Sequence, residues 1–558
     1  MNKRNFRLTF TAASVLVIAI AIFLTSVVGN MGNARVDLTT DKLFTMSPSA
    51  AKILGELSVP VQIKYYVTGA SEMPTELKNL ERDITDKLRD YESASGGMLE
   101  LSIYDPQNNE ELQEELTGRG IRPFKVQSID KDEMGIKLIW SSLSIAYKDY
   151  PEEIIPQILP QSTTTLEYEL ISMVYRLTQD KKPKVALYAP AIEVDQQTAM
   201  MYMQQGMQPP APQEIYGTVS KMLQQEQYEI VKVDITAESQ IPVDADILVV
   251  LGPKNLTPRQ EFEINRAISN GMNTLFAVQA HEYNYSFPNR SGIDVQGRGT
   301  PSGLENMFNQ FGVSVSTDHL CDENNEILGV PRQQNLGGMR FNTNEPVRLP
   351  IHVKVSESQM NQDIAITNRI SELLYLWGSA LETDKTKLLN NELTVKTLMS
   401  SSNRSWVSDF TDGIVANSVF TRNQTDGNLP LAMMIEGTFP DSYSGREIPG
   451  WDSETEAAIV PLAAAPAKIV LVGCAKMFDD SALQAGQNAL LLLNSIDSMV
   501  HGDDLISIRS KLMTQRVIKP VGDTAKVLLR LFAVGLVPVV LVVFGLSRAN
   551  SRRRKETA

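Results

Sequence analysis

Three observations predict an α/β protein whose body lies between two membrane-spanning helices. Short apolar runs alternate with amphipathic helical stretches, a pattern typical of doubly wound parallel sheets. A long apolar run lies near each end of the chain. The 558 residues also exceed the size of one ordinary core. We therefore expect extracytoplasmic doubly wound α/β domains with β-rich additions, flanked by an N-terminal and a C-terminal transmembrane helix.

The first apolar run, residues 8–28, carries no charge and is long enough to cross a bilayer as a helix. Arg4 and Arg7 precede it, which predicts a cytoplasmic start within residues 1–34. A cleaved signal peptide is the alternative interpretation. The length of the run exceeds that of a usual signal-peptide core, so the sequence favours an anchor.

The second apolar run, residues 527–546, lies within the C-terminal segment 521–558. Its single charge, Arg530, lies near its start, where a long cationic side chain can reach the membrane interface. Behind it comes a basic tail with Arg552, Arg553 and Arg554. The positive-inside rule then predicts an inner-membrane protein with both termini in the cytoplasm and its bulk outside. The tail could also bind anionic lipid head groups or a cytoplasmic partner.

A first α/β domain is expected over residues 35–180. Ser47 and Pro48 suit the cap and the first position of a helix. A strand, a helix and a second strand then follow as a βαβ unit. The predicted elements after the first helix are a strand at 59–67, a helix from Leu77, a strand at 96–106, a hairpin at 136–154 and a helix at 163–178.

A second α/β domain is expected over residues 181–340, with buried strands and helices in alternation. Its predicted strands are 184–189, 228–234, 245–253 and 272–279, and its predicted helices are 214–226 and 258–270. Residues 317–358 are polar and give no clear assignment. From Ile370 onward, longer strands predict a β-rich insertion within a further α/β region, 341–520, which closes with a buried strand and a helix.

The stretch "GCAKMFDD", residues 473–480, places Cys474 beside Asp479 and Asp480 directly after a predicted strand. A cysteine nucleophile needs a histidine partner, and the chain has only four histidines, none suitably placed in the sequence. We therefore expect Cys474 to be a small buried residue. The two aspartates either cap the helix predicted to follow them or contact a ligand.

Met200, Met201, Met203 and Met207 form a methionine-rich stretch that we expect to be a mobile surface loop. Thioethers are soft ligands that suit Cu(I), but no histidine or cysteine accompanies these methionines. A partner-binding or lid loop is the favoured interpretation. We expect no metal and no cofactor.

Several stretches resemble the GldG-like auxiliary proteins of ABC transporters, a family first associated with gliding motility. They are "VDLTTDKLFTMSPSAAKIL", "GGMLELSIYDP", the strand–helix–strand "DILVVLGPKNLTPRQEFEINRAISNGMNTLFAV", and the segment from "VGCAKMFDD" to "LISIRSK", which includes Phe478, Asp480, Asn488, Asn494 and Asp497. The resemblance implies a membrane-anchored component with amidotransferase-like α/β domains, related in fold to an intraflagellar-transport domain. The amidotransferase nucleophile is missing here. The resemblance also implies a separate ABC permease and ATPase as partners.

Together these features predict a non-catalytic auxiliary subunit of an ABC-type transport system that contacts membrane lipid and binds an unknown substrate or envelope partner. The net charge of −14 makes nucleic acid an unsuitable partner. Two alternatives remain: a structural envelope tether, and an enzyme that acts on envelope polymers with Asp479, Asp480 or Asp503 as acid and base.

Overall fold

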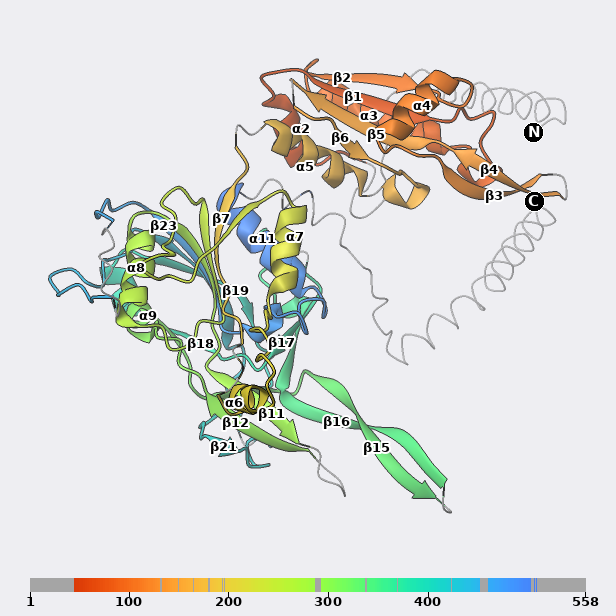
Figure 1. Ribbon diagram of the computed structural model, residues 1–558. Coiled ribbons are helices and arrows are strands. Elements are labelled where there is room, and N and C mark those ends of the chain that lie inside the picture. The colour runs from red at the N-terminus through yellow and green to blue at the C-terminus, as the bar shows by residue number, and fades with distance from the viewer. Residues whose placement is uncertain are drawn as a thin grey trace, which may run out of the picture. The chain divides into compact units, whose positions relative to one another are not determined.

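The computed structural model describes residues 45–508, all within the compact unit Met1–Met513 (Figure 1). The gaps in this range are 131–132, 149, 164, 179–180, 193, 195, 287–292, 337–338, 369, 423, 452–459, 503–505 and 507. The predicted spans 8–28 and 527–546 lie outside the described residues. Within those residues, no helix has the length and apolar character needed to span a bilayer.

The first α/β region contains a mixed four-stranded sheet in the order β2-β1-β5-β6. Parallel pairing of β1 with β2 around α3 confirms the predicted βαβ unit. The Ser47 side chain accepts a hydrogen bond from the Ala50 amide, as expected for the cap of α2. The elements are α2 (Pro48–Gly55), β1 (Val61–Val67), η1 (Thr75–Leu77), α3 (Leu80–Ala94), β2 (Leu99–Tyr104), α4 (Glu110–Gly118), β3 (Phe124–Asp130), β4 (Glu133–Ile139), β5 (Ser141–Tyr147), β6 (Glu153–Ile155), η2 (Pro160–Thr163) and α5 (Leu166–Thr178).

The central feature of the second region is a seven-stranded sheet in the order β19-β22-β23-β10-β9-β7-β8. Five neighbouring strands, β23 to β8, are parallel. β22 runs antiparallel to β23, and β19 pairs antiparallel with β22. Strands from both predicted regions, 181–340 and 341–520, share this sheet. Its strands are β7 (Lys184–Tyr188), β8 (Glu229–Lys232), β9 (Ile247–Leu251), β10 (Asn273–Ala277), β19 (Thr394–Ser400), β22 (Pro430–Gly437) and β23 (Ala467–Val472).

Helices cover both faces of this sheet, so the region has three layers (Figure 1). Alternate residues of each strand point to opposite faces. Accordingly, Val249 packs in one core with α7 (Gly217–Gln225) and α11 (Asn488–Val500), whereas Val250 packs in the other with α8 (Pro258–Ser269) and α9 (Glu305–Phe311). Burial on both faces explains why these strands read as continuous apolar runs.

The parallel strands follow the flavodoxin-like order, with β7 between β8 and β9. The chain moves from β7 to β8 on one side and then returns to β9 on the other. The strand order therefore reverses between β7 and β9. At such a point the loops after neighbouring strands diverge and leave a crevice at the carboxyl edge of the sheet.

Between β10 and β23 the chain forms several small sheets. The unassigned stretch 317–358 contains a long hairpin of β15 and β16, drawn as an extended two-stranded ribbon in Figure 1. The remaining elements are α6 (Gln196–Gln204), β11 (His281–Ser286), β12 (Asp294–Gly299), β13 (Val313–Val315), β14 (His319–Asp322), β15 (Asn325–Leu336), β16 (Met339–Ser356), η3 (Glu357–Gln359), β17 (Glu372–Leu376), β18 (Leu381–Thr383), α10 (Lys385–Asn390), β20 (Ser405–Ser408), β21 (Gly413–Ile414) and η4 (Lys476–Phe478).

Candidate functional site at the carboxyl edge of the sheet

The stretch "GCAKMFDD" forms the corner where β23 ends, in the middle of the seven-stranded sheet. A Cβ on Gly473 would lie 2.5 Å from both the Ser379 carbonyl oxygen and the Tyr375 hydroxyl. No larger residue fits there without displacing the backbone of a neighbouring segment. The corner is therefore tightly packed from its first residue.

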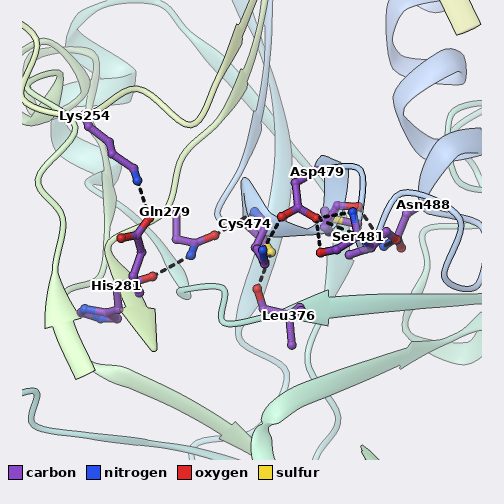
Figure 2. A network of polar contacts seen from close by, with 12 residues as sticks. Lys254, Gln279, His281, Leu376, Cys474, Asp479, Ser481 and Asn488 are labelled. Carbon is purple, nitrogen blue, oxygen red and sulfur yellow. Dashed lines mark hydrogen bonds and ion pairs between the residues drawn. The ribbon is translucent and has the colours of Figure 1, made fainter. Parts of the chain in front are cut away.

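Cys474 is fully buried, and its thiol lies 3.1 Å from the Leu376 carbonyl oxygen, to which it donates a hydrogen bond (Figure 2). Burial raises the pKa of this thiol to about 12. Because the thiolate is the nucleophile, a group held neutral in this way is inert at ordinary pH. The prediction of a small buried cysteine is confirmed, and Cys321 is likewise buried and not in a disulfide.

Asp479 is 3% exposed and stabilises the turn that follows it (Figure 2). One carboxylate oxygen accepts hydrogen bonds from the Ser481 amide at 3.0 Å, the Ser481 hydroxyl at 2.6 Å and the Ala482 amide at 3.1 Å. The other oxygen pairs with Lys476. Asp480 is exposed and accepts a hydrogen bond from the Thr218 amide at 2.8 Å. Both carboxylates are thus engaged by the protein itself.

The helix predicted directly after these aspartates begins later, at Asn488, so that prediction was wrong in position. Residues 481–486 form turns that end at Gly486, whose φ is +56°. This left-handed backbone cannot continue a right-handed helix. Asp479 therefore caps a turn, and the caps of the helix lie elsewhere.

The other polar residues of the quoted C-terminal motif also hold the fold together. The Asn488 amide donates to the carbonyl oxygens of Leu374, Met477 and Ala482, each at 3.0 Å. Asn494 donates to the Ile366 carbonyl, and Asp497 accepts from the Tyr228 hydroxyl at 2.5 Å. These contacts join segments far apart in the sequence, which is a structural role.

A pocket of about 270 Å³ opens beside this corner, at the point where the strand order reverses. Four turns line it, each following a parallel strand: 190–192 after β7, 252–254 after β9, Gln279 after β10 and 475–476 after β23. The rest of the wall consists of Ile215, Tyr216, Glu282, Thr300, Trp377 and Asp479. This is the position at which open α/β sheets bind ligands.

Charges in the pocket are balanced within it. Lys254 pairs with Glu282, and Lys476 pairs with Asp479 (Figure 2). Gln279 fixes the floor, because its side-chain oxygen accepts from the Lys476 amide at 2.8 Å and its nitrogen donates to the His281 carbonyl at 2.7 Å. The pocket therefore offers paired cations and carboxylates to a small polar ligand, with no net charge of its own.

Gly252 is required by the geometry of the pocket wall. Its φ is +55°, and a Cβ there would lie 2.4 Å from the Tyr216 hydroxyl. Burial, followed by the nearby Asp479 carboxylate, raises the pKa of Tyr216 far above its usual range. The Tyr216 hydroxyl, which lies next to Gly252, therefore stays protonated.

Histidines of the described residues do not form a nucleophile–base pair with Cys474. His319 Nδ1 lies 2.7 Å from the Tyr283 hydroxyl, and His352 Nε2 lies 2.5 Å from the Tyr285 hydroxyl. Burial lowers the pKa of His281, His319 and His352 to about 4. These imidazoles are thus neutral near pH 7 and cannot hold a thiolate by charge.

A second cavity of about 470 Å³ adjoins the pocket, and Gln279 and Thr300 line both. One wall is the His281 ring, stacked on Phe410 with their centroids 4.0 Å apart. Asp412 lines the same cavity and accepts a hydrogen bond from the Gly299 amide. The two cavities together extend the carboxyl edge into a larger concave surface.

The four methionines are exposed, by 61% for Met200, 51% for Met201, 64% for Met203 and 48% for Met207. The surface position is as predicted, but Met200, Met201 and Met203 lie in helix α6, not in a loop. Alanine, glutamine and methionine are good helix formers, and they outweighed the loop signal of the nearby glycine and prolines. No described residues form a cluster of histidine, cysteine and carboxylate side chains suited to a metal ion.

The predicted membrane-flanking residues Arg4, Arg7, Arg530, Arg552, Arg553 and Arg554 lie outside the described residues. Sequence reasoning found the corner but missed Lys254, Gln279, Glu282 and Trp377. The first three follow predicted strands 245–253 and 272–279, so the carboxyl ends of those strands were the available signal. Trp377 comes from the insertion, and nothing in its local sequence indicated the pocket.

Two family models match the chain. Residues 182–500 match the family model described as an ABC-type uncharacterized transport system, and residues 40–146 match a domain of unknown function, DUF7088. An uncharacterized protein of Borreliella burgdorferi is 21% identical over 539 residues, covering 93% of this chain and 94% of that protein.

Two solved structures show distant likeness. The mmIFT52 N-terminal domain has a TM-score of 0.31 and 11% identity, over 57% of this chain and 98% of that one. A putative ThuA-like protein from Bacteroides uniformis has a TM-score of 0.28 and 10% identity, over 59% of this chain and 98% of that one. Scores at this level do not establish a common fold. The family model, in contrast, covers more than half of the 558 residues, and the chain belongs to that auxiliary family of ABC-type transport systems.

Proposed function

We propose that this chain is a non-catalytic auxiliary subunit that binds a substrate or an envelope partner for a separate ABC permease and ATPase. The observation that carries the proposal is the pocket at the carboxyl edge of the sheet, in a chain of an ABC-transport auxiliary family. The pocket is lined by paired charges and by a fixed glutamine, which suit recognition. Within this proposal the chain belongs to the GldG-like branch, with an amidotransferase-like fold that lacks the nucleophile.

The contacts at the corner support binding over catalysis. A general acid or base needs a carboxylate that can reach a substrate proton. The Asp479 carboxylate is buried and receives three hydrogen bonds and one ion pair, and Asp480 holds the start of α7. Asp503, the third candidate of the enzyme alternative, lies outside the described residues.

Membrane anchoring is part of the proposal. The apolar runs 8–28 and 527–546 are long enough to cross a bilayer, and the cations beyond them favour cytoplasmic termini. The acidic body would then lie outside the cytoplasm. Protease added to intact spheroplasts should digest the body and leave the C-terminal tail protected, and a protected body would contradict this topology.

Copurification tests the partnership. The full chain, tagged and extracted from membranes in mild detergent, should retain a permease and an ATPase identified by mass spectrometry. A membrane protein of similar abundance carrying the same tag is the control. If the chain is recovered without transporter components at low and moderate salt, the subunit proposal is wrong.

A pocket variant separates a binding subunit from a structural tether. Ala191 is exposed and lines the pocket, so Ala191→Trp should fill the mouth without disturbing the core. We expect this variant to keep its transporter partners but to lose transport in cells, whereas Ala70→Trp, at an exposed site in the other region, should keep both. Normal transport by Ala191→Trp would favour the tether.

A further inference from the structure

A wide, open groove of about 1040 Å³ lies away from the carboxyl edge, where β14 turns into β15. Its lining is rich in amides and hydroxyls from several segments, including Asn324, Asn403, Asn428 and Ser358. None of these residues belongs to the pocket or the cavity described above. The groove is therefore a separate surface.

Hydrogen bonds to buried groups hold two of the residues that line the groove, Ser402 and Trp406. Asp322 is fully buried and accepts hydrogen bonds from the Ser402 amide at 2.7 Å and the Ser402 hydroxyl at 2.5 Å. The Trp406 indole is 4% exposed and donates to the Val419 carbonyl at 3.0 Å. Beside it, the half-buried Phe420 offers an apolar ring to the groove. A ligand would meet a preformed surface.

The charge of the groove is opposite to that of the chain. Arg404 and Arg422 both pair with one carboxylate, Glu323, which leaves a cationic excess. Arg348 also lines the groove, is exposed, and forms no ion pair with any described residue. In a chain with a net charge of −14, this local positive charge favours an anionic ligand.

In two side-chain amides of the groove, one polar atom is hydrogen-bonded to the protein and the other is not. Asn325 donates to the carbonyl oxygens of Asp322 and Glu323, yet its buried Oδ1 has no hydrogen-bond partner among the described residues. Gln359 accepts from the Ser356 amide at 2.6 Å, yet its buried Nε2 has no partner in the same part of the chain. The held ends fix which atom is oxygen and which is nitrogen. Buried polar atoms left unpaired are unfavourable, so a ligand group that paired with either atom would be favoured.

We propose that this groove binds an acidic oligosaccharide. A sugar hydroxyl both donates and accepts, so hydroxyls can satisfy the Asn325 oxygen and the Gln359 nitrogen alike. Sugar carboxylates suit the planar guanidinium of Arg348. The apolar face of a sugar ring can pack on Phe420, and an open groove admits an extended chain. This site is independent of the pocket in the proposed function.

Isothermal titration of the full chain in detergent tests the proposal, with a galacturonate hexasaccharide as the probe. We expect binding that weakens as salt rises from about 50 mM to about 300 mM, because exposed charges are then screened. A neutral maltohexaose should bind far more weakly. Equal binding of the two sugars, or none of either, would overturn the proposal.

Arg348→Ala is the sharpest variant, because this side chain has no ion pair with a described residue to lose. It should weaken hexasaccharide binding about tenfold, as expected for loss of a charge-assisted hydrogen bond. Arg82→Ala, at an exposed arginine on α3 of the other region, is the matched control and should bind normally. Equal affinity of the two variants would contradict the assignment.

Gln359→Glu supplies a second test that preserves the fold. The new side chain still accepts from the Ser356 amide, but an oxygen replaces the unused nitrogen donor. We expect weaker hexasaccharide binding and a fall of no more than a few degrees in the melting temperature, because the new oxygen is buried without a donor. Unchanged binding would count against the groove. If a hexaglutamate peptide binds as tightly as the hexasaccharide and displaces it, the groove is a peptide site and the proposal is wrong.

Discussion

The corner at 473–480 and the groove at β14–β15 are both polar, but they differ in how their polar groups are satisfied. At the corner, Asp479 and Asn488 each receive or make several hydrogen bonds within the protein. In the groove, Asn325 and Gln359 each keep an unused buried atom. A polar cluster whose groups all pair with one another stabilises the fold. A cluster that keeps unpaired polar atoms can still pair with a ligand.

The largest effect should follow removal of the Asp479 carboxylate. Asp479→Ala deletes three hydrogen bonds and leaves Lys476 without its ion-pair partner. We expect a loss of about 3 kcal/mol, seen as a fall of roughly 6–12 °C in the melting temperature. The adjacent Asp480→Ala, which loses one exposed hydrogen bond, should cost less than about 1 kcal/mol. Similar losses from the two variants would break the comparison.

A somewhat smaller effect is expected at Gly252. Gly252→Ala places a Cβ against the Tyr216 hydroxyl at positive φ and should destabilise the protein by about 2 kcal/mol. Tyr216→Phe removes the clashing oxygen, so the double variant should regain about half of the loss. Thermal unfolding of the four proteins in this cycle measures the interaction. Strict additivity would show that the hydroxyl is not the obstacle.

Cys474 gives a pH-dependent prediction. Its pKa of about 12 exceeds the ordinary thiol value of 9.0, so the folded protein favours the neutral form. The stabilisation is complete below pH 9. Above pH 9 the thiol ionises first in the unfolded state, so the free energy of unfolding falls as pH rises toward 12, and the loss is about 1 kcal/mol at pH 10. Cys474→Ala should flatten this decline in the melting temperature. Native protein at pH 8 should also resist iodoacetamide at Cys474, and rapid labelling there would contradict the buried thiol.

The smallest effect should come from the groove. Arg348→Ala removes an exposed side chain that pairs with no carboxylate in the described part of the chain, so the free energy of unfolding should change by less than about 0.5 kcal/mol. The same variant is expected to weaken sugar binding, so stability and binding separate at this position. A large loss of stability would show that Arg348 supports the fold and that the groove resembles the corner.

Regular elements of the sheet were predictable because their signal is local. Runs such as 185–188 and 247–251 are apolar without interruption, and Thr257 with Pro258 marks the start of α8. The outer part of the hairpin within 317–358 was not predictable, since its strands are polar there. Residues 347–355 do place an apolar residue at every second position, a strand signal that the sequence analysis missed. The helix that ends at Val500 was predicted, but its start was not. Gly486 has a positive φ, so the helix begins only after it, at Asn488, and composition does not reveal this backbone conformation.

The sites were harder to predict because their residues come together only in the folded chain. Gln279 and Lys476 touch across nearly 200 positions, and no spacing in the sequence signals that contact. The groove similarly combines Arg348, Gln359 and Arg422 from separate segments. The corner was identified because its residues are contiguous in the sequence. The unpaired atoms of the groove can be recognised only once the structure gives the hydrogen-bond partners.

The position of β23 has a consequence for how the protein is made. This strand lies between β10 and β22, yet the ribosome produces it about 190 residues after β10. Until it emerges, one edge of β10 is unpaired, and β19 and β22 can pair with each other but not with the parallel strands. Closing so long a loop is slow. Nascent chains that stop before residue 467 should therefore need a chaperone, because the unpaired edge of β10 can pair with other chains and cause aggregation.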